Sequence, residues 1–165
     1  MANPFEKYLT FEDREHIRVA NYIKDKLPDI VAFHVPNEGK KSAFERYKYS
    51  LMGALKGCPD FVLLCPKFKS IDSKEIVYNG LLIELKAQEH NRIVLKGKDA
   101  GKIKKTKGKL SDEQKIILNK LTDIGYLAVC CYGSEEAISI IDNYFSDYLI
   151  LRKDLERSRW KIPHK

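Results

Sequence analysis

Two apolar segments in the middle of the chain constrain the fold most, because each carries charged residues at one end. The first is DFVLLC at 60–65, and the second is IVYNGLLIELK at 76–86. Both have the length and the aliphatic, β-branched composition of buried strands. A polar turn around 66–75 separates them, so we expect neighbouring strands joined as a hairpin.

Three charged residues occupy the ends of these segments. Asp60 opens the first segment directly after Gly-Cys-Pro, and Glu84 and Lys86 stand two apart near the end of the second. Side chains alternate along a strand, so Glu84 and Lys86 project to one face while Ile83 and Leu85 project to the other. The hairpin can therefore bring two carboxylates and one ammonium group together.

Two carboxylates and a lysine are sufficient for phosphodiester hydrolysis. Mg²⁺ prefers oxygen ligands, and proteins hold it through one or two carboxylates, waters and substrate phosphate oxygens. Such an ion polarises the phosphoryl group and lowers the pKa of bound water. A nearby lysine can orient or deprotonate the attacking water and stabilise negative charge. A turn aspartate and a solvated Glu-x-Lys strand end are the alternative interpretation of these residues.

The remaining segments predict helices and two further strands around this hairpin. Thr10 and Ser111 are candidate helix caps, with Asp13 and Gln114 in capping-box positions, and Ser134 is expected to cap the last helix. We expect helices over 10–27, 43–53, 111–125 and 134–148, and strands over 30–35 and 126–132. The order predicts an α/β fold with a central mixed sheet flanked by helices.

Size and composition suit one domain, expected over 1–149, followed by a basic tail at 150–165. No apolar run reaches the roughly 20 residues needed to cross a membrane, and no signal peptide is expected. The four cysteines form no CxxC pair, which favours reduced thiols and a cytoplasmic, intracellular setting. The formal charge of +7 favours polyanionic partners.

A basic insertion lies at 87–110. Its segment RIVLKGKDAGKIKKTKGK (92–109) has eight basic residues against Asp99 alone. A flexible cationic arm that grips DNA phosphates is favoured over a solvated, disordered loop, because the segment must leave and return beside Lys86. The candidate DNA-binding residues are Lys56, Arg92, Lys96, Lys98, Lys102, Lys104, Lys105, Lys107 and Lys109.

The P-D…E-x-K pattern resembles that of the PD-(D/E)XK nuclease superfamily. The fuller pattern is similar to its VRR-NUC branch, in five elements that run in the same order across 15–114. They are a glutamate in the first helix, HVPNEG (34–39), KGCPD (56–60), GLLIELK (80–86) and LSDEQ (110–114). The resemblance implies a restriction-endonuclease-like core and an endonuclease that depends on Mg²⁺ or Mn²⁺. The basic insertion departs from the compact family pattern.

The resemblance also implies roles for single residues. Asp60 and Glu84 correspond to the metal-binding carboxylates, with the carbonyl of Leu85 as a further ligand, and Lys86 corresponds to the catalytic lysine. Gln114 corresponds to a glutamine that positions the lysine, water or phosphate, although a helix cap alone would also explain it.

Three further residues have roles implied less directly. Glu15 corresponds to the first-helix glutamate that completes the metal site, with Glu12 as a near competitor. Asn37 falls in a polar loop near the site and is a candidate DNA contact, although a plain turn explains it almost as well. His34 is interpreted as a strand histidine rather than a base.

Stand-alone members of this family, often phage-encoded, are similar to Holliday-junction resolvases. The leading hypothesis is therefore a structure-selective DNA endonuclease that resolves four-way junctions, acting in the bacterial cytoplasm if it is phage-encoded. Paired incision of a branched substrate needs two active sites, which a C2 homodimer supplies. A nicking or flap endonuclease is the alternative enzyme, and a non-catalytic DNA-binding scaffold is the alternative outside enzymes.

Overall fold

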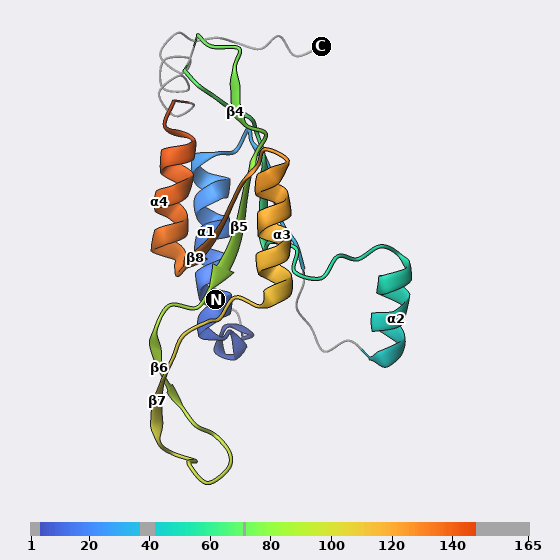
Figure 1. Ribbon diagram of the computed structural model, residues 1–165. Coiled ribbons are helices and arrows are strands. Elements are labelled where there is room, and N and C mark those ends of the chain that lie inside the picture. Colours follow the sequence, from blue (N-terminus) through green and yellow to red (C-terminus); the bar gives the residue numbers. More distant parts are fainter. Residues whose placement is uncertain (1–3, 37–41, 71, 148–165) are drawn as a thin grey trace.

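A four-stranded mixed sheet forms the centre of the molecule, with helices on both faces, as predicted from the sequence (Figure 1). The computed structural model describes residues 4–36, 42–70 and 72–147. The strand order is β1-β2-β5-β8, and only the β5–β8 pair is parallel. The strands are β1 (Val31–His34), β2 (Phe61–Leu64), β5 (Leu81–Lys86) and β8 (Leu127–Tyr132).

Three helices cover the sheet, and a fourth stands apart from it. Helices α1 (Phe11–Lys26) and α4 (Ser134–Tyr144) pack against each other on one face, and α3 (Asp112–Asp123) lies on the other (Figure 1). Helix α2 (Ala43–Leu51) projects to the side of the body, and none of its residues is buried. A 3₁₀ turn, η1 (Glu6–Tyr8), precedes α1.

The helix starts follow the predicted caps with one exception. Thr10 with Asp13, and Ser111 with Gln114, both form complete capping boxes, in which each side chain accepts a bond from the other residue's backbone N–H. Ser134 does not cap α4, because Gly133 occupies the N-cap with a φ of 90° and Ser134 is the first helical residue. The predicted end of this helix at Tyr148 lies outside the described residues.

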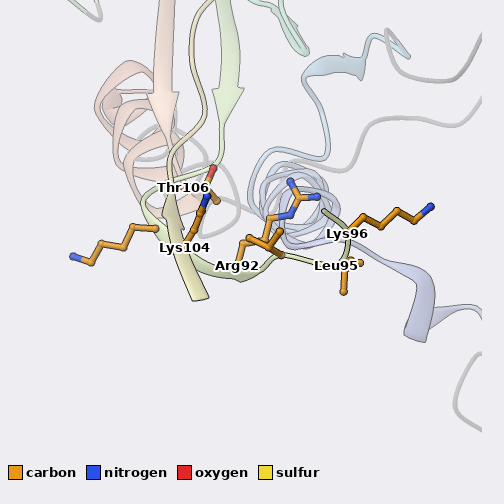
Figure 2. Close-up of a pocket in the computed structure, with 7 residues that line it drawn as sticks. Arg92, Leu95, Lys96, Lys104 and Thr106 are labelled. Carbon is orange, nitrogen blue, oxygen red and sulfur yellow. The ribbon is translucent and has the colours of Figure 1, made fainter. Parts of the chain in front are cut away.

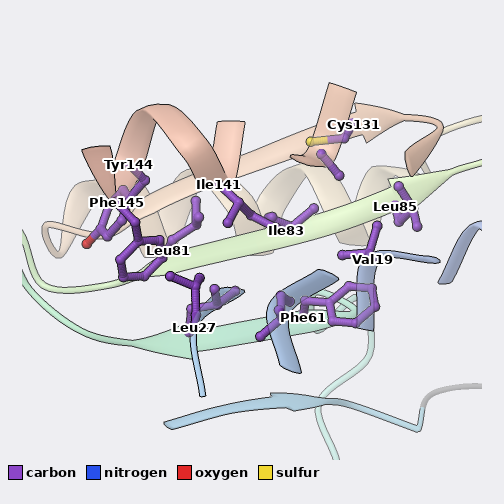
Figure 3. Packing of buried hydrophobic residues seen from close by; sticks show 13 residues of the cluster. Val19, Leu27, Phe61, Leu81, Ile83, Leu85, Cys131, Ile141, Tyr144 and Phe145 are labelled. Carbon is purple, nitrogen blue, oxygen red and sulfur yellow. The ribbon is translucent and has the colours of Figure 1, made fainter. Parts of the chain in front are cut away.

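The core lies between the sheet and the α1–α4 pair (Figure 3). Ile83 and Leu85 of β5 and Val19 of α1 are almost completely buried there. Because side chains alternate along β5, Glu84 and Lys86 face the opposite side, where α3 buries Ile117 and Leu118. The apolar packing on one face thus determines which residues of β5 lie on the opposite face.

The predicted strand 76–86 is two strands in the structure. Residues Ile76–Tyr78 form β4, which pairs with β3 (Lys67–Phe68) in a small separate sheet. At the break, the Asn79 N–H donates to the carbonyl of Gly125 at 2.8 Å. A Cβ on Gly80 would lie 2.9 Å from the Leu63 carbonyl oxygen, so only glycine allows β5 to enter the sheet this close to β2.

The basic insertion is an ordered hairpin rather than the flexible arm expected from its composition. Strands β6 (His90–Ile93) and β7 (Ile103–Thr106) pair antiparallel and project beyond the end of the main sheet (Figure 1). The tail at 150–165 lies outside the described residues. None of the helices in the described parts of the chain combines the length and apolarity needed to cross a bilayer.

Candidate active site

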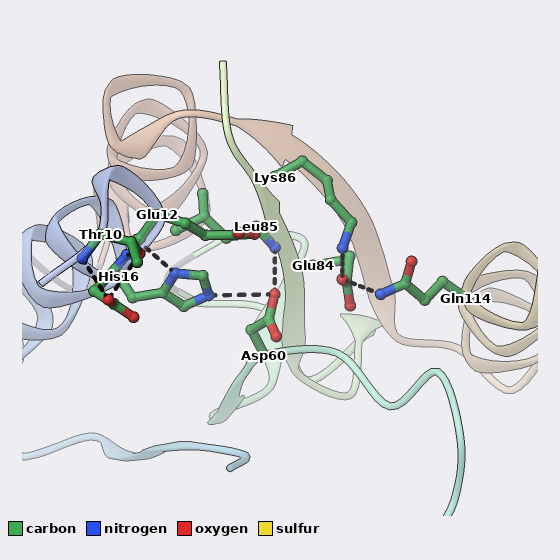
Figure 4. A network of polar contacts seen from close by, with 9 residues as sticks. Thr10, Glu12, His16, Asp60, Glu84, Leu85, Lys86 and Gln114 are labelled. Carbon is green, nitrogen blue, oxygen red and sulfur yellow. Dashed lines mark hydrogen bonds and ion pairs between the residues drawn. The ribbon is translucent and has the colours of Figure 1, made fainter. Parts of the chain in front are cut away.

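Asp60 lies at the entry to β2, where its carboxylate meets the end of β5. It is 6% exposed, and its Oδ2 accepts a hydrogen bond from the Leu85 N–H at 2.8 Å (Figure 4). The β2–β5 ladder ends at the Phe61–Ile83 pair, so the Asp60 side chain takes the place of a ladder partner for Leu85. The N–H and carbonyl of one strand residue point the same way, so the Leu85 carbonyl also faces Asp60.

A glycine before Asp60 allows this approach. Gly57 has a φ of 76°, and a Cβ there would lie 2.8 Å from the backbone carbon of Glu113 at the start of α3. The loop leading to Asp60 therefore passes directly against the first turn of α3. This contact places the loop that enters β2 next to the start of α3.

Glu84 is the most deeply buried charged residue of the site, at 1% exposure. Its Oε1 lies 2.7 Å from the Lys86 Nζ and also accepts a bond from the Gln114 side-chain amide (Figure 4). Its Oε2 has no hydrogen-bond partner in the described parts of the chain. Burial raises the pKa of the Glu84 carboxyl, and Lys86 opposes this effect.

Lys86 is held in its charged form. Burial alone would lower the pKa of its ammonium group, but the bond to Glu84 and the charges of Asp60 and Glu12 outweigh burial and raise it. Its Cβ is also covered from the side, since a Cβ on Gly108 would lie 2.9 Å from it. Lys86 is thus placed by both an ion pair and a backbone contact.

Gln114 forms the predicted helix cap and also contacts Glu84. Its side-chain oxygen accepts from the Ser111 N–H at 2.9 Å, which completes the capping box of α3. The side-chain nitrogen donates to Glu84. A single amide therefore connects the start of α3 to the central carboxylate.

The two glutamates of α1 have different surroundings. Glu15 shares the buried stripe of Val19 and Ile23, and its Oε2 accepts from the Ser134 N–H at 2.5 Å, at the start of α4. This bond satisfies a free N–H of the helix terminus. Glu12 instead lines the cleft that contains Asp60 and Glu84. In this arrangement Glu15 contacts the start of α4, and Glu12 is the glutamate of α1 that lines the cleft.

His16 is a site residue that the sequence did not indicate. Its Nε2 lies 3.5 Å from Asp60 Oδ2 (Figure 4), while its Nδ1 lies 2.9 Å from the Glu12 carbonyl oxygen. Burial lowers the pKa of His16, but these contacts outweigh burial and raise it to about 9. The available signal was its spacing from Glu12, since i and i+4 share one helix face.

His34 joins this group from the edge strand. It contacts His16 edge-on at a ring separation of 5.4 Å. One ligand atom each from His16, His34 and Asp60 lies within 4.8 Å of the others. Asp60 thus adjoins two imidazoles on one side and Glu84 on the other.

A cleft of about 910 Å³ opens over these groups. One wall is formed by the strand ends, the start of α3 and Glu12 of α1, and the other by α2 with the loop that follows it. The lining residues include Glu12, Asp60, Glu84, Lys86 and Gln114, with Arg46, Tyr47, Tyr49 and Lys56 opposite. Acidic groups therefore lie at the base of the cleft and basic and aromatic groups on its outer wall.

The donors at the base of the cleft fit a hard divalent cation. An ionised oxygen that is buried without a partner is costly, and Glu84 Oε2 is in this position. Burial is the main cause of the raised pKa of the neighbouring Cys58 thiol, and the negative charges of Glu84 and Asp60 raise it further. The electrostatic field at this place therefore favours positive charge. Carboxylate and carbonyl oxygens are the ligands that Mg²⁺ and Mn²⁺ prefer.

Comparison with known proteins identifies the architecture. No family model matches the sequence, and no curated protein does. A solved structure described as a VRR_NUC domain protein matches with a TM-score of 0.59 at 24% identity, covering 84% of this chain and 91% of that one. The chain has the fold of a VRR_NUC domain protein.

The predicted DNA-binding residues are distributed over two places on this VRR_NUC fold. Lys56 lines the outer wall of the cleft, and the other lysines and Arg92 lie on or next to the β6–β7 hairpin. Lys107 differs from them, because its Nζ lies 3.9 Å from the centre of the Tyr132 ring. Asn37 lies outside the described residues.

Proposed function

We propose that the chain is a metal-dependent DNA endonuclease of the VRR-NUC family. The observation that carries this proposal is the convergence of Asp60, Glu84 and Lys86, with one buried oxygen of Glu84 that has no partner among the residues the structure describes. The five-part sequence pattern and the shared fold support the family assignment. The positive net charge agrees with a polyanionic substrate.

Asp60, Glu84 and the Leu85 carbonyl are the groups that would hold Mg²⁺ or Mn²⁺. Such an ion supplies polarisation of the phosphoryl oxygens and lowers the pKa of bound water. The Glu84 carboxylate orients Lys86, and the Lys86 ammonium donates hydrogen bonds to the attacking water or to the phosphate oxygens. Gln114 limits the rotation of Glu84 through its amide and so positions it.

Within this function, we favour cleavage of branched DNA by a homodimer. Resolution of a four-way junction requires two symmetric cuts, and hence two active sites. Helix α2 supports a dimer, because Phe44, Tyr47 and Leu51 are 71%, 63% and 71% exposed. Large exposed apolar patches mark interaction surfaces, and this one adjoins the cleft.

The direct test is cleavage of labelled four-way junction, flap, nicked and linear duplex DNA with Mg²⁺, Mn²⁺ or EDTA. The wild type is compared with Asp60→Ala and with the matched control Asp72→Ala, an exposed carboxylate in the β3–β4 turn. We expect paired cuts on the junction that require the metal and Asp60 but not Asp72.

The proposed dimer is tested separately. Sedimentation measures the oligomeric state of the wild type and of Leu51→Ser.

The outcomes separate the alternatives. Metal-dependent cuts on flaps or nicked duplex alone would keep the nuclease and exclude the resolvase. Binding without metal-dependent cleavage of any substrate, unchanged by Asp60→Ala, would favour a non-catalytic scaffold and overturn the proposal.

A further inference from the structure

The β6–β7 hairpin carries large aliphatic side chains that a purely electrostatic arm does not require. Ile93, Leu95 and Ile103 are 58%, 79% and 67% exposed, and all three lie near the tip. A hollow of about 560 Å³ lies at this end, lined by Arg92, Val94, Leu95, Lys96 and Lys104 among others (Figure 2). Cationic and apolar groups therefore lie together at the tip of the hairpin.

The register of the hairpin sorts these groups by face. Ile93 is the cross-strand partner of Ile103, and Arg92 is the partner of Lys104. Cross-strand partners share a face, and adjacent residues have opposite faces. One face of the ribbon thus presents an apolar pair, and the other presents a cationic pair. Beyond the strands, the Val94 N–H donates to the Lys102 carbonyl at 2.9 Å and fixes the tip.

Contacts at its base attach the hairpin to the body of the protein. The rings of Phe11 and His90 stack at 4.3 Å. The Gly108 N–H donates to the Ala87 carbonyl at 2.8 Å, and Lys107 lies over Tyr132. Because Ala87 directly follows Lys86, the hairpin projects from the edge of the proposed active site.

Charge complementarity identifies the occupant of this surface. Asp99 pairs with Lys102 and Lys104 at 3.0 and 2.5 Å, but the segment 92–109 still has a large excess of basic residues. A partner must combine dense negative charge with flat apolar surfaces. Nucleic acid has both, since its phosphates flank bases whose faces become accessible wherever stacking is broken.

We propose that the β6–β7 hairpin is a two-stranded arm that enters a DNA groove at a branch point. Its basic side chains contact phosphates, and Ile93, Leu95 and Ile103 press against unstacked bases. Apolar side chains that wedge between base steps are an established way to bind distorted DNA. The inference rests on the proposed function, since it takes DNA as the substrate.

The apolar tip would give the hairpin selectivity for branched DNA, which phosphate contacts do not provide. Contacts to phosphates fix position and do not distinguish a branch from continuous duplex. Opening a base step in duplex DNA is costly, whereas bases at a branch point are already partly unstacked. The same wedge therefore favours branched over linear DNA, and its effect is on selectivity rather than on the chemical step.

The test uses the full-length Asp60→Ala chain in EDTA, so that binding is measured without cleavage. The probe is a four-way junction with 2-aminopurine next to the branch, whose fluorescence rises when the base unstacks. We compare the parent with Leu95→Ser and Ile93→Ser/Ile103→Ser. The matched control is Ile124→Ser, which is 63% exposed at the end of α3.

We expect the parent and the control to raise the fluorescence and the arm variants to lose this rise. The arm variants should bind the junction roughly tenfold more weakly, with linear-duplex affinity and thermal midpoint unchanged. Unchanged fluorescence and junction selectivity in both arm variants would overturn the inference. So would a change from dimer to monomer with junction binding intact, because the tip would then be a protein contact.

These outcomes differ from failure of the proposed nuclease. Absence of metal-dependent cleavage by the wild type would overturn the nuclease, while a fluorescence rise lost in Leu95→Ser would still support the arm. If the Asp60→Ala chain binds neither junction nor duplex, the arm is overturned.

Discussion

The end of the sheet that carries the proposed active site and the β6–β7 hairpin are joined by three residues, yet they are built in opposite ways. At the sheet end, Asp60 and Glu84 are almost completely buried, and each has specific partners. On the hairpin the charged side chains are exposed, and their ion pairs lie at the surface. The proposed chemistry at the sheet end therefore depends on the positions of single atoms, whereas the electrostatic attraction of the hairpin for a polyanion depends on the sum of many charges.

This difference predicts how each region responds to mutation. A buried charge interacts strongly with few neighbours, whereas an exposed charge is screened by water and salt. Single substitutions at the sheet end should therefore have large effects that depend little on salt. Substitutions of charged residues on the hairpin should have small, additive effects that depend on salt.

The largest effect is expected for Glu84→Gln, which keeps the shape of the side chain and removes its charge. Cleavage should fall by at least about 10²- to 10³-fold. The variant should also lose the rise in melting temperature that Mg²⁺ gives the wild type, since stabilisation by a ligand requires its binding to the folded state. Calorimetry with and without Mg²⁺ measures this, and full activity in the variant would contradict the assigned site.

Substitutions of the two glutamates of α1 should have different effects, one mainly on cleavage and the other mainly on the free energy of unfolding. Glu12→Gln should lower cleavage by about 10- to 100-fold and leave the free energy of unfolding within about 0.5 kcal/mol. Glu15→Gln should lower the free energy of unfolding by about 1–2 kcal/mol, because it weakens the charged cap of α4, and cleavage should persist. Urea titration and initial rates measure both, and the reverse pattern would return Glu15 to the metal site.

Substitution of Gln114 should affect both stability and cleavage, and comparison with a Ser111 variant should separate the two effects. Gln114→Ala removes both the capping box and the bond to Glu84, whereas Ser111→Ala removes only the cap. Each should lower the free energy of unfolding by about 1 kcal/mol. Only Gln114→Ala should also lower cleavage, by roughly tenfold. Equal rates in the two variants would restrict Gln114 to its structural role.

The smallest effects are expected on the hairpin. Lys96→Ala and Lys98→Ala should each weaken DNA binding a few-fold and reduce the slope of log K against log salt by about 0.9. Lys120→Ala on α3 is the matched control. Lys107→Ala should change the slope less, because Lys107 lies over Tyr132. If the loss of affinity does not change with salt concentration, these lysines act through specific contacts instead.

Much of the site could be predicted because it depends on strand alternation. The spacing of Glu84 and Lys86 placed both on one face of β5, and the alternating apolar residues Ile83 and Leu85 identified the other face. Gln114 could be placed because a capping box is a local pattern. These features involve residues close in sequence, where geometry follows directly from the backbone.

Other features depend on contacts between distant segments. Glu15 was preferred over Glu12 from motif spacing, although Glu15 shares the helical phase of buried Val19 and Ile23. The approach of His16 to Asp60 requires α1 to pack beside β2, which spacing within α1 cannot specify. The hairpin was missed because its lysines resemble a disordered run, while its order comes from the antiparallel pairing of β6 with β7.

The contact between Ala87 and Gly108 has a consequence for how this protein can vary. The hairpin segment leaves and rejoins the body at a single backbone hydrogen bond of 2.8 Å, so its length is independent of the rest of the fold. Lengthening or replacing a surface segment whose ends are already together adds little closure entropy. Another binding module could therefore be inserted at this position, next to Lys86, without moving Lys86.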